Sequence, residues 1–221
     1  MKIEIDPKES VRAEAFALWM SSPMPMVTLT KRFEVGKVVK WSKRWEMKFN
    51  ALLCWCIGKA ASQVKEFYVL PEQGKLYQYD CLAINVIVKN SRGGINSCDI
   101  PFSDDIQKFS DDYNRLTTLT SVEGKSFFLE DYMVIGTSAM IQTEIDSIVN
   151  QYTDKFANPM VMWGKYRTGW LKTMLPISFQ FHHVQMDGGE GAMFLELLQR
   201  EINLLASPSR KDLKSTISAK K

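Results

Sequence analysis

The segment MLPISFQFHHVQMDGGEGAMFLELLQREINLLA, residues 174–206, decides how this chain folds. Its first part belongs to an apolar run over residues 173–184 that is typical of a β-strand. Gly188 and Gly189 then permit a turn, because glycine adopts backbone angles that other residues resist. The remainder is amphipathic, with apolar residues that recur at helical spacing and predict a helix packed on the sheet. These are Met193, Phe194, Leu197, Leu198, Ile202 and Leu205.

Other helices and strands alternate along the rest of the chain. Helices are predicted at 10–20, with Ser10 as N-cap, at about 48–65, and at 103–120, starting with Ser103 and two aspartates. Strands are predicted at 26–35, within 76–90 and at 131–142. The stretch from Lys37 to Lys48 is a basic, tryptophan-containing connection.

Length and composition indicate one globular domain. A chain of 221 residues with 45% apolar and 24% charged residues can bury enough surface to fold without disulfides or metals. We predict a single domain over residues 1–206, which is favoured over two domains. Residues 207–221 are polar and basic, and are predicted to form a flexible tail.

Charge and cysteine content exclude several classes of protein. A net charge of only +3 argues against a dedicated nucleic-acid-binding protein. The N-terminus has no secretory h-region, and no stretch reaches the ~18 apolar residues that span a bilayer. A cytoplasmic protein with Cys54, Cys56, Cys81 and Cys98 as thiols is therefore expected. Cys54 and Cys56 lie two apart on a predicted helix, where side chains do not face each other, so we expect no metal site.

The two histidines of the chain are adjacent at the end of the predicted strand. Side chains of consecutive strand residues point to opposite faces, so His182 and His183 should have different surroundings. Asp187 follows four residues after His183, where the chain must turn. Imidazole titrates near neutral pH and can take a proton from a hydroxyl group. The strand–HHxxxDG–helix arrangement therefore indicates general base catalysis.

The motif QFHHVQMDG resembles the signature of the chloramphenicol acetyltransferase family, whose HHxxxDG core recurs in related CoA-dependent acyltransferases. The resemblance covers roughly residues 5–203. It implies a two-layer α/β sandwich, an α+β fold with a large mixed sheet and helices on one face. It also implies that His183 is the general base. Asp187 would pair with Arg12 of the segment SVRAEAF and thereby support the loop beneath His183.

The resemblance also implies residues that bind the two substrates. Lys48 in MKFNALL and Tyr166 in MWGKYR match positions that contact CoA, and Trp19 matches an aromatic residue on the acceptor side. The chain departs from the family at Met162, where a threonine that stabilises the tetrahedral intermediate is expected. Val184 replaces a small residue of the motif, and the two residues after Asp187-Gly188 are Gly189 and Glu190 in place of an aromatic residue and a histidine. A CoA-side tyrosine is replaced by Asn50.

The family serine that bonds the developing oxyanion has no single match. An alignment without gaps places Ile135 there, whereas a small gap brings in Ser138, with Thr137 beside it. We assign Ser138. Losing one such donor typically raises the barrier by ~2.7–4 kcal/mol, so this choice bears on whether the chain is active.

Taken together, the resemblance predicts direct acetyl transfer from acetyl-CoA to a hydroxyl of chloramphenicol or a similar small acceptor. It predicts a homotrimer with active sites between subunits, and no metal, nucleic acid or membrane. Two alternatives remain: the same fold acting on an unrelated acceptor, and a catalytically weak CoA-binding trimer.

Overall fold

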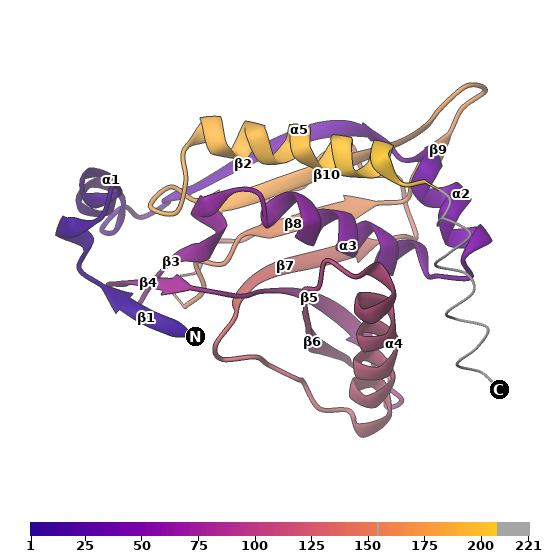
Figure 1. The fold of residues 1–221 in the computed structure, drawn as a ribbon, viewed down its shortest axis with the longest axis horizontal. Helices are drawn as coiled ribbons and strands as arrows, with labels where there is room; N and C mark the ends of the chain where they lie inside the picture. Colours follow the sequence, from indigo (N-terminus) through magenta and orange to yellow (C-terminus); the bar gives the residue numbers. More distant parts are fainter. Residues whose placement is uncertain (154, 207–221) are drawn as a thin grey trace.

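The structure is a computed structural model that describes residues 1–153 and 155–206. The predicted basic tail, residues 207–221, lies outside the described residues. Figure 1 shows a large twisted sheet with helices packed along one face, and a smaller sheet beside one end of it.

The large sheet has seven strands in the order β2-β10-β8-β7-β5-β6, with β9 paired to β10. β5, β7 and β8 run parallel to one another, while β10 is antiparallel to both of its neighbours β2 and β8. The sheet is therefore mixed, as expected. Its strands are β2 (Met26–Glu34), β5 (Leu82–Lys89), β6 (Ile95–Pro101), β7 (Met133–Met140), β8 (Met160–Gly164), β9 (Arg167–Thr168) and β10 (Thr173–His182).

Three helices cover one face of this sheet, which confirms the predicted fold class. They are α3 (Phe49–Ala61), α4 (Ile106–Glu123) and α5 (Gly188–Leu204). The N-terminal turn of α5 lies directly on the sheet, because a Cβ atom added to Gly191 would meet Phe181 at 2.7 Å. This close approach fixes the turn that joins β10 to α5.

β10 shows strict alternation between the two faces of the sheet. Leu175, Ile177, Phe179 and Phe181 belong to the hydrophobic core under the helices. The intervening Ser178, Gln180 and His182 are buried on the other face. There the connection between β7 and β8 covers them, since Ile148 donates its backbone N–H to Ser178 and Asn150 accepts from the Gln180 amide.

A second, smaller sheet combines the N-terminal strand with two strands from residues 69–79. A three-stranded antiparallel sheet has the order β1-β4-β3. Its strands are β1 (Lys2–Ile5), β3 (Val69–Glu72) and β4 (Lys75–Tyr79), and the short elements around it are η1 (Pro7–Glu9), α1 (Ala13–Trp19) and η2 (Lys65–Tyr68). Figure 1 places α1 and this small sheet at the same end of the molecule as the β10–α5 turn.

Several predicted boundaries were wrong. The first helix is shorter than predicted, and its N-cap is Arg12. Ser10 is instead the C-cap of η1, and its hydroxyl accepts the backbone N–H of Arg12. The N-cap of α4 is Asp105, since its side chain accepts the N–H groups of Gln107 and Lys108, and not Ser103. Met193 is exposed, although it was predicted to pack on the sheet.

The basic connection after β2 proved to be a helix, α2 (Gly36–Arg44). It buries Val38 and Trp41 and leaves its cationic side chains exposed, so it is an amphipathic helix with a narrow apolar side. The many lysines concealed this short apolar pattern in the sequence.

The cysteines are free thiols, and three of them are buried. Burial raises the pKa of Cys54 to about 12. The described residues contain no group of three or more histidine, cysteine or acidic side chains that could hold a metal ion. Within the same residues, no helix has the length and apolar character that crossing a membrane requires.

Candidate active site

The turn between β10 and α5 is held in place on both sides. The backbone N–H of His183 donates to Pro25 at the start of β2, and that of Val184 donates to Nδ1 of His182. Asp187 and Glu190 form a capping box at the start of α5. Residues 183–187 therefore form a rigid turn, and β10 ends one residue before His183.

The Arg12 side chain binds this turn through four hydrogen bonds. Its guanidinium donates to the carbonyls of Val184 at 2.9 Å and His183 at 2.6 Å. It also donates to both carboxylate oxygens of Asp187, at 2.7 and 2.8 Å. A planar guanidinium suits this arrangement because its donors form a fixed fork. The structure thus brings Arg12 and Asp187 together, as the resemblance implies.

The charges of this pair are mutually stabilising. The hydrogen bond from Arg12 holds the pKa of Asp187 below its usual range, and the same hydrogen bond raises the pKa of Arg12. Arg12 is largely buried whereas the Asp187 side chain is half exposed, so solvent screens part of the interaction. Both groups stay charged at neutral pH.

His183 is stacked against Trp19. The two rings are nearly parallel, at 5°, with their centroids 4.5 Å apart. On its other side, Nδ1 of His183 lies 3.1 Å from Oδ1 of Asp187, but the geometry is not that of a hydrogen bond. The carboxylate therefore lies beside the Nδ1 edge of the imidazole. Trp19, assigned to the acceptor side by resemblance, therefore contacts the predicted base directly.

His182 has a different environment. It is almost completely buried, and its Nδ1 accepts the Val184 N–H. Burial, with a smaller contribution from the neighbouring His183, lowers the pKa of His182 to about 4. His182 is therefore neutral at pH 7 and supports the turn, whereas His183 has its ring at the partly exposed side.

The predicted CoA contacts lie together in a second place. Lys48 is the N-cap of α3, with its Nζ atom 5.8 Å from the centroid of the Tyr113 ring on α4. The next residue, Phe49, packs against Tyr166 with ring centroids 5.2 Å apart. Asn50, where the resemblance places a tyrosine, follows in the first turn of α3 and is partly exposed. The start of α3 and the end of β8 thus form one cluster.

Ser138 and Met162 are neighbours on β7 and β8. Both point to the face opposite the helices, in one row with Ser178 of β10. Thr137 and Ile135 point the other way, into the core, where the Thr137 hydroxyl donates to the Asn85 carbonyl. Of the three candidate positions for an oxyanion donor, only Ser138 has its side chain on the face away from the helices.

These groups do not meet within one chain. Ser138 on β7 and Ser178 on β10 lie in the same row across the sheet, two strands apart. His183 follows Ser178 by five residues. It therefore lies about 17 Å from Ser138 along the strand direction and about 10 Å from it across the strands. Tyr166 adjoins Arg167, which pairs with Met174, so Tyr166 lies about 30 Å from His183 along β10. Figure 1 shows these two ends, with α1 at one and α2 and β9 at the other.

Two features of the site were not predicted from the sequence. Trp19 stacks on His183, and Gln185 is completely buried within the turn, with its side-chain oxygen lacking a hydrogen-bond partner among the described residues. The place of Gln185 between the two motif positions His183 and Asp187 was the available signal. Val184 is also buried, and it contributes its carbonyl to Arg12.

Comparison with known proteins identifies the family. The family model described as chloramphenicol acetyltransferase matches residues 2–199. The chain is 26% identical over 208 residues to chloramphenicol acetyltransferase 3 of Escherichia coli, covering 90% of this chain and 96% of that protein. It is 21% identical over 193 residues to chloramphenicol acetyltransferase 2 of Escherichia coli, covering 85% and 91%.

Solved structures show the same fold. A chloramphenicol acetyltransferase superposes with a TM-score of 0.79 at 20% identity, covering 91% of this chain and all of that chain. A probable dihydrolipoamide acetyltransferase from Listeria monocytogenes superposes with a TM-score of 0.67 at 10% identity, covering 94% and 96%. With a family model that spans nearly the whole chain, this protein belongs to the chloramphenicol acetyltransferase family.

Proposed function

We propose that this protein transfers an acetyl group from acetyl-CoA to a hydroxyl of chloramphenicol or a similar small acceptor, with His183 as general base. The observation that carries the proposal is the environment of His183. Its ring is fixed between Trp19 and Asp187, on a turn that Arg12 holds by four hydrogen bonds. A base held in one orientation contributes to catalysis because its geometry is set before the substrate arrives.

The reaction is a direct transfer. Nδ1 of His183 is buried against Asp187, so Nε2 takes the proton from the acceptor hydroxyl while that oxygen attacks the thioester carbonyl. When the resulting tetrahedral intermediate collapses, the C–S bond breaks and the CoA sulfur takes the proton from the imidazolium. No covalent acyl-enzyme is needed. Cys54 and Cys56 support this view, because burial raises their pKa far above neutrality and leaves no thiolate nucleophile.

The active site of this proposal lies between subunits of a homotrimer. His183 is about 30 Å from Tyr166 in one chain, too far for a single chain to bring base and CoA together. A neighbouring chain would place its Lys48, Tyr166 and Ser138 opposite His183. The end that carries the base is suited to such contact, since α1 buries none of its residues and exposes Leu18.

A second candidate keeps the chemistry but changes the acceptor. Met162 is apolar and almost completely buried beside Ser138, where the resemblance leads us to expect a threonine. This change supports a less polar acceptor than chloramphenicol. A third candidate is a trimer that binds CoA with little catalysis. We assign the activity to the cytoplasm, in line with four cysteines present as free thiols.

Acyl transfer is tested by mixing the purified protein with acetyl-CoA and chloramphenicol and following release of the CoA thiol. We expect release at a rate that depends on chloramphenicol. Release with another hydroxyl compound only would select the second candidate. CoA binding without release for any member of an acceptor panel would select the third and contradict the catalytic proposal.

Mixed trimers test the intersubunit site. A base-deficient chain, His183→Ala, is co-expressed with a chain deficient at the CoA end, Lys48→Glu with Tyr166→Ala. Random assembly should give about one quarter of wild-type activity, because half of the bases and, independently, half of the facing CoA sites are intact. Each variant expressed alone should be almost inactive. If the co-expressed sample is no more active than the separate samples, the two halves of the site belong to the same chain.

A further inference from the structure

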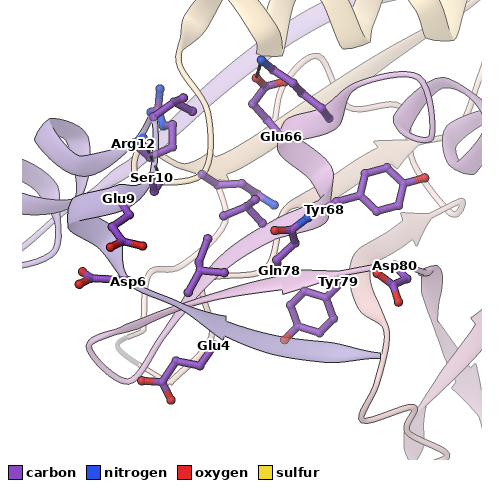
Figure 2. A pocket seen from close by; sticks show the side chains of 15 residues that line it. Glu4, Asp6, Glu9, Ser10, Arg12, Glu66, Tyr68, Gln78, Tyr79 and Asp80 are labelled. Carbon is purple, nitrogen blue, oxygen red and sulfur yellow. Dashed lines mark hydrogen bonds and ion pairs between the residues drawn. The ribbon is translucent and has the colours of Figure 1, made fainter.

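The short helix α1 brings two side chains to the turn that carries His183. Arg12 is the N-cap of this helix and Trp19 is its last residue, seven positions later. Seven residues make about two turns of an α-helix, so both side chains leave α1 on the same side. Figure 2 shows Arg12 beside Ser10, whose hydroxyl accepts the backbone N–H of Arg12 and fixes the start of the helix.

Trp19 presents the face of its indole ring to the imidazole of His183. The two rings are nearly parallel, at 5°, with their centroids 4.5 Å apart. α1 buries none of its residues, so Trp19 is not a residue of the hydrophobic core. The stack on His183 therefore has a reason other than the packing of the fold.

A positive charge forms on this imidazole in the proposed reaction. Nε2 of His183 takes the proton of the acceptor hydroxyl while that oxygen attacks the thioester carbonyl, and the proton later passes to the CoA sulfur. Between these two transfers the ring is an imidazolium. A group that stabilises this charge acts in the transition state more than in the bound substrates, so it raises the rate more than the substrate affinity.

The charged side chains around the ring are already engaged with one another. Asp187 lies 3.1 Å from Nδ1 of His183, but both of its carboxylate oxygens accept hydrogen bonds from Arg12. Glu190 accepts the backbone N–H of Asp187 at 3.0 Å. His182, whose pKa is lowered by burial to about 4, is neutral at pH 7. Because the negative charge of Asp187 is shared with Arg12, the electron-rich face of the indole is a second group that can stabilise the imidazolium.

The geometry of the stack suits that role. The faces of an aromatic ring carry partial negative charge, and a cation within about 6 Å of the ring centroid is attracted to it, most strongly by tryptophan. We propose that Trp19 stabilises the imidazolium form of His183 through a cation–π contact while the proton is held on the ring. This inference rests on the proposed acetyl transfer and adds to it a residue that contacts the reacting group.

Fluorinated tryptophans placed at residue 19 test the charge of the indole face while keeping its shape nearly constant. Fluorine withdraws electron density from the ring, so kcat for thiol release should fall stepwise with each added fluorine, by about tenfold in total. KM for acetyl-CoA should stay within a factor of about two, because the contact acts on the transition state. The same replacement at Trp170, which is 99% exposed, is the matched control and should leave kcat unchanged.

Two ordinary substitutions give a second readout. Trp19→Phe keeps an aromatic face with a weaker attraction for cations, whereas Trp19→Leu keeps an apolar side chain without a π-system. We expect kcat to fall about threefold in Trp19→Phe and about tenfold in Trp19→Leu. Thermal unfolding should be nearly unchanged in both variants, since α1 buries none of its residues.

The outcomes separate this inference from the assignment of the base. If the fluorinated proteins turn over at the wild-type rate, or if only the KM of the acceptor rises, Trp19 does not stabilise the charge, and this inference alone is overturned. If His183→Ala releases the CoA thiol as fast as the wild type, the proposed base is wrong and the role of Trp19 fails with it.

Discussion

The variant His183→Ala is expected to transfer acetyl groups about 10³- to 10⁴-fold more slowly than the wild type, which is the upper range for removal of a general base. Its affinity for CoA should stay within a factor of about two, because the proposed CoA contacts are Lys48 and Tyr166 and the imidazole is assigned only the proton transfer. The rate is measured by thiol release, and the affinity by calorimetry with CoA.

His182→Asn is the matched control. His182 is neutral and buried, and its only described side-chain bond accepts the Val184 N–H, which an asparagine oxygen can also accept. We therefore expect less than a tenfold loss of activity. If His183→Ala kept more than a tenth of wild-type activity, or if His182→Asn were the inactive variant, the assignment of the base would be wrong.

The second large effect is expected for Arg12→Ala. This change removes four hydrogen bonds and leaves the carbonyls of His183 and Val184 and the carboxylate of Asp187 without their donor. The free energy of unfolding should fall by about 2 kcal/mol, a value reduced because Asp187 is half exposed. Turnover should fall about 100-fold, since the turn no longer holds the imidazole in place.

Arg12→Lys separates charge from geometry. It keeps the positive charge but cannot donate to four acceptors at once, so we expect intermediate stability and activity. Thermal unfolding and thiol release are measured on the same samples. Wild-type turnover in Arg12→Lys would mean that only the charge matters and that the fork of hydrogen bonds has no role in positioning His183.

The Arg12–Asp187 pair also predicts a pH dependence. Because Arg12 depresses the pKa of Asp187 in the folded protein, the pair stabilises the fold above the unfolded pKa of about 3.9. That stabilisation is lost as pH falls through the lower folded pKa. The difference in unfolding temperature between wild type and Arg12→Ala should thus be full at pH 6 and shrink below about pH 4. If wild type and Arg12→Ala differed in unfolding temperature by the same amount at pH 6 and below about pH 4, the charge of the Asp187 carboxylate would make no contribution to stability.

Much of the fold could be predicted from local patterns. The alternation of apolar residues in β10 and their helical repeat in α5 are easy to recognise in the sequence. Each element packs one whole face against the hydrophobic core, so apolar residues recur along its full length. α2 was missed because only its narrow side is buried, so its sequence is dominated by exposed cations. Helix starts were misplaced at Ser10 and Ser103, where serine forms a turn just before the cap and the true N-cap lies two residues later.

The sequence by itself determined the chemistry available to this protein. The spacing of His183 and Asp187 places both residues on the short turn between the end of β10 and the start of α5. The backbone preferences of a few neighbouring residues are enough to form such a turn. Tertiary structure decided which groups cooperate. Arg12 reaches Asp187 across 175 residues, and Trp19 reaches His183, only because β2 pairs with β10 and brings α1 beneath the turn. The order of strands likewise separates His183 from Tyr166. Contacts of this kind arise from packing between distant segments, which no local pattern of residues encodes.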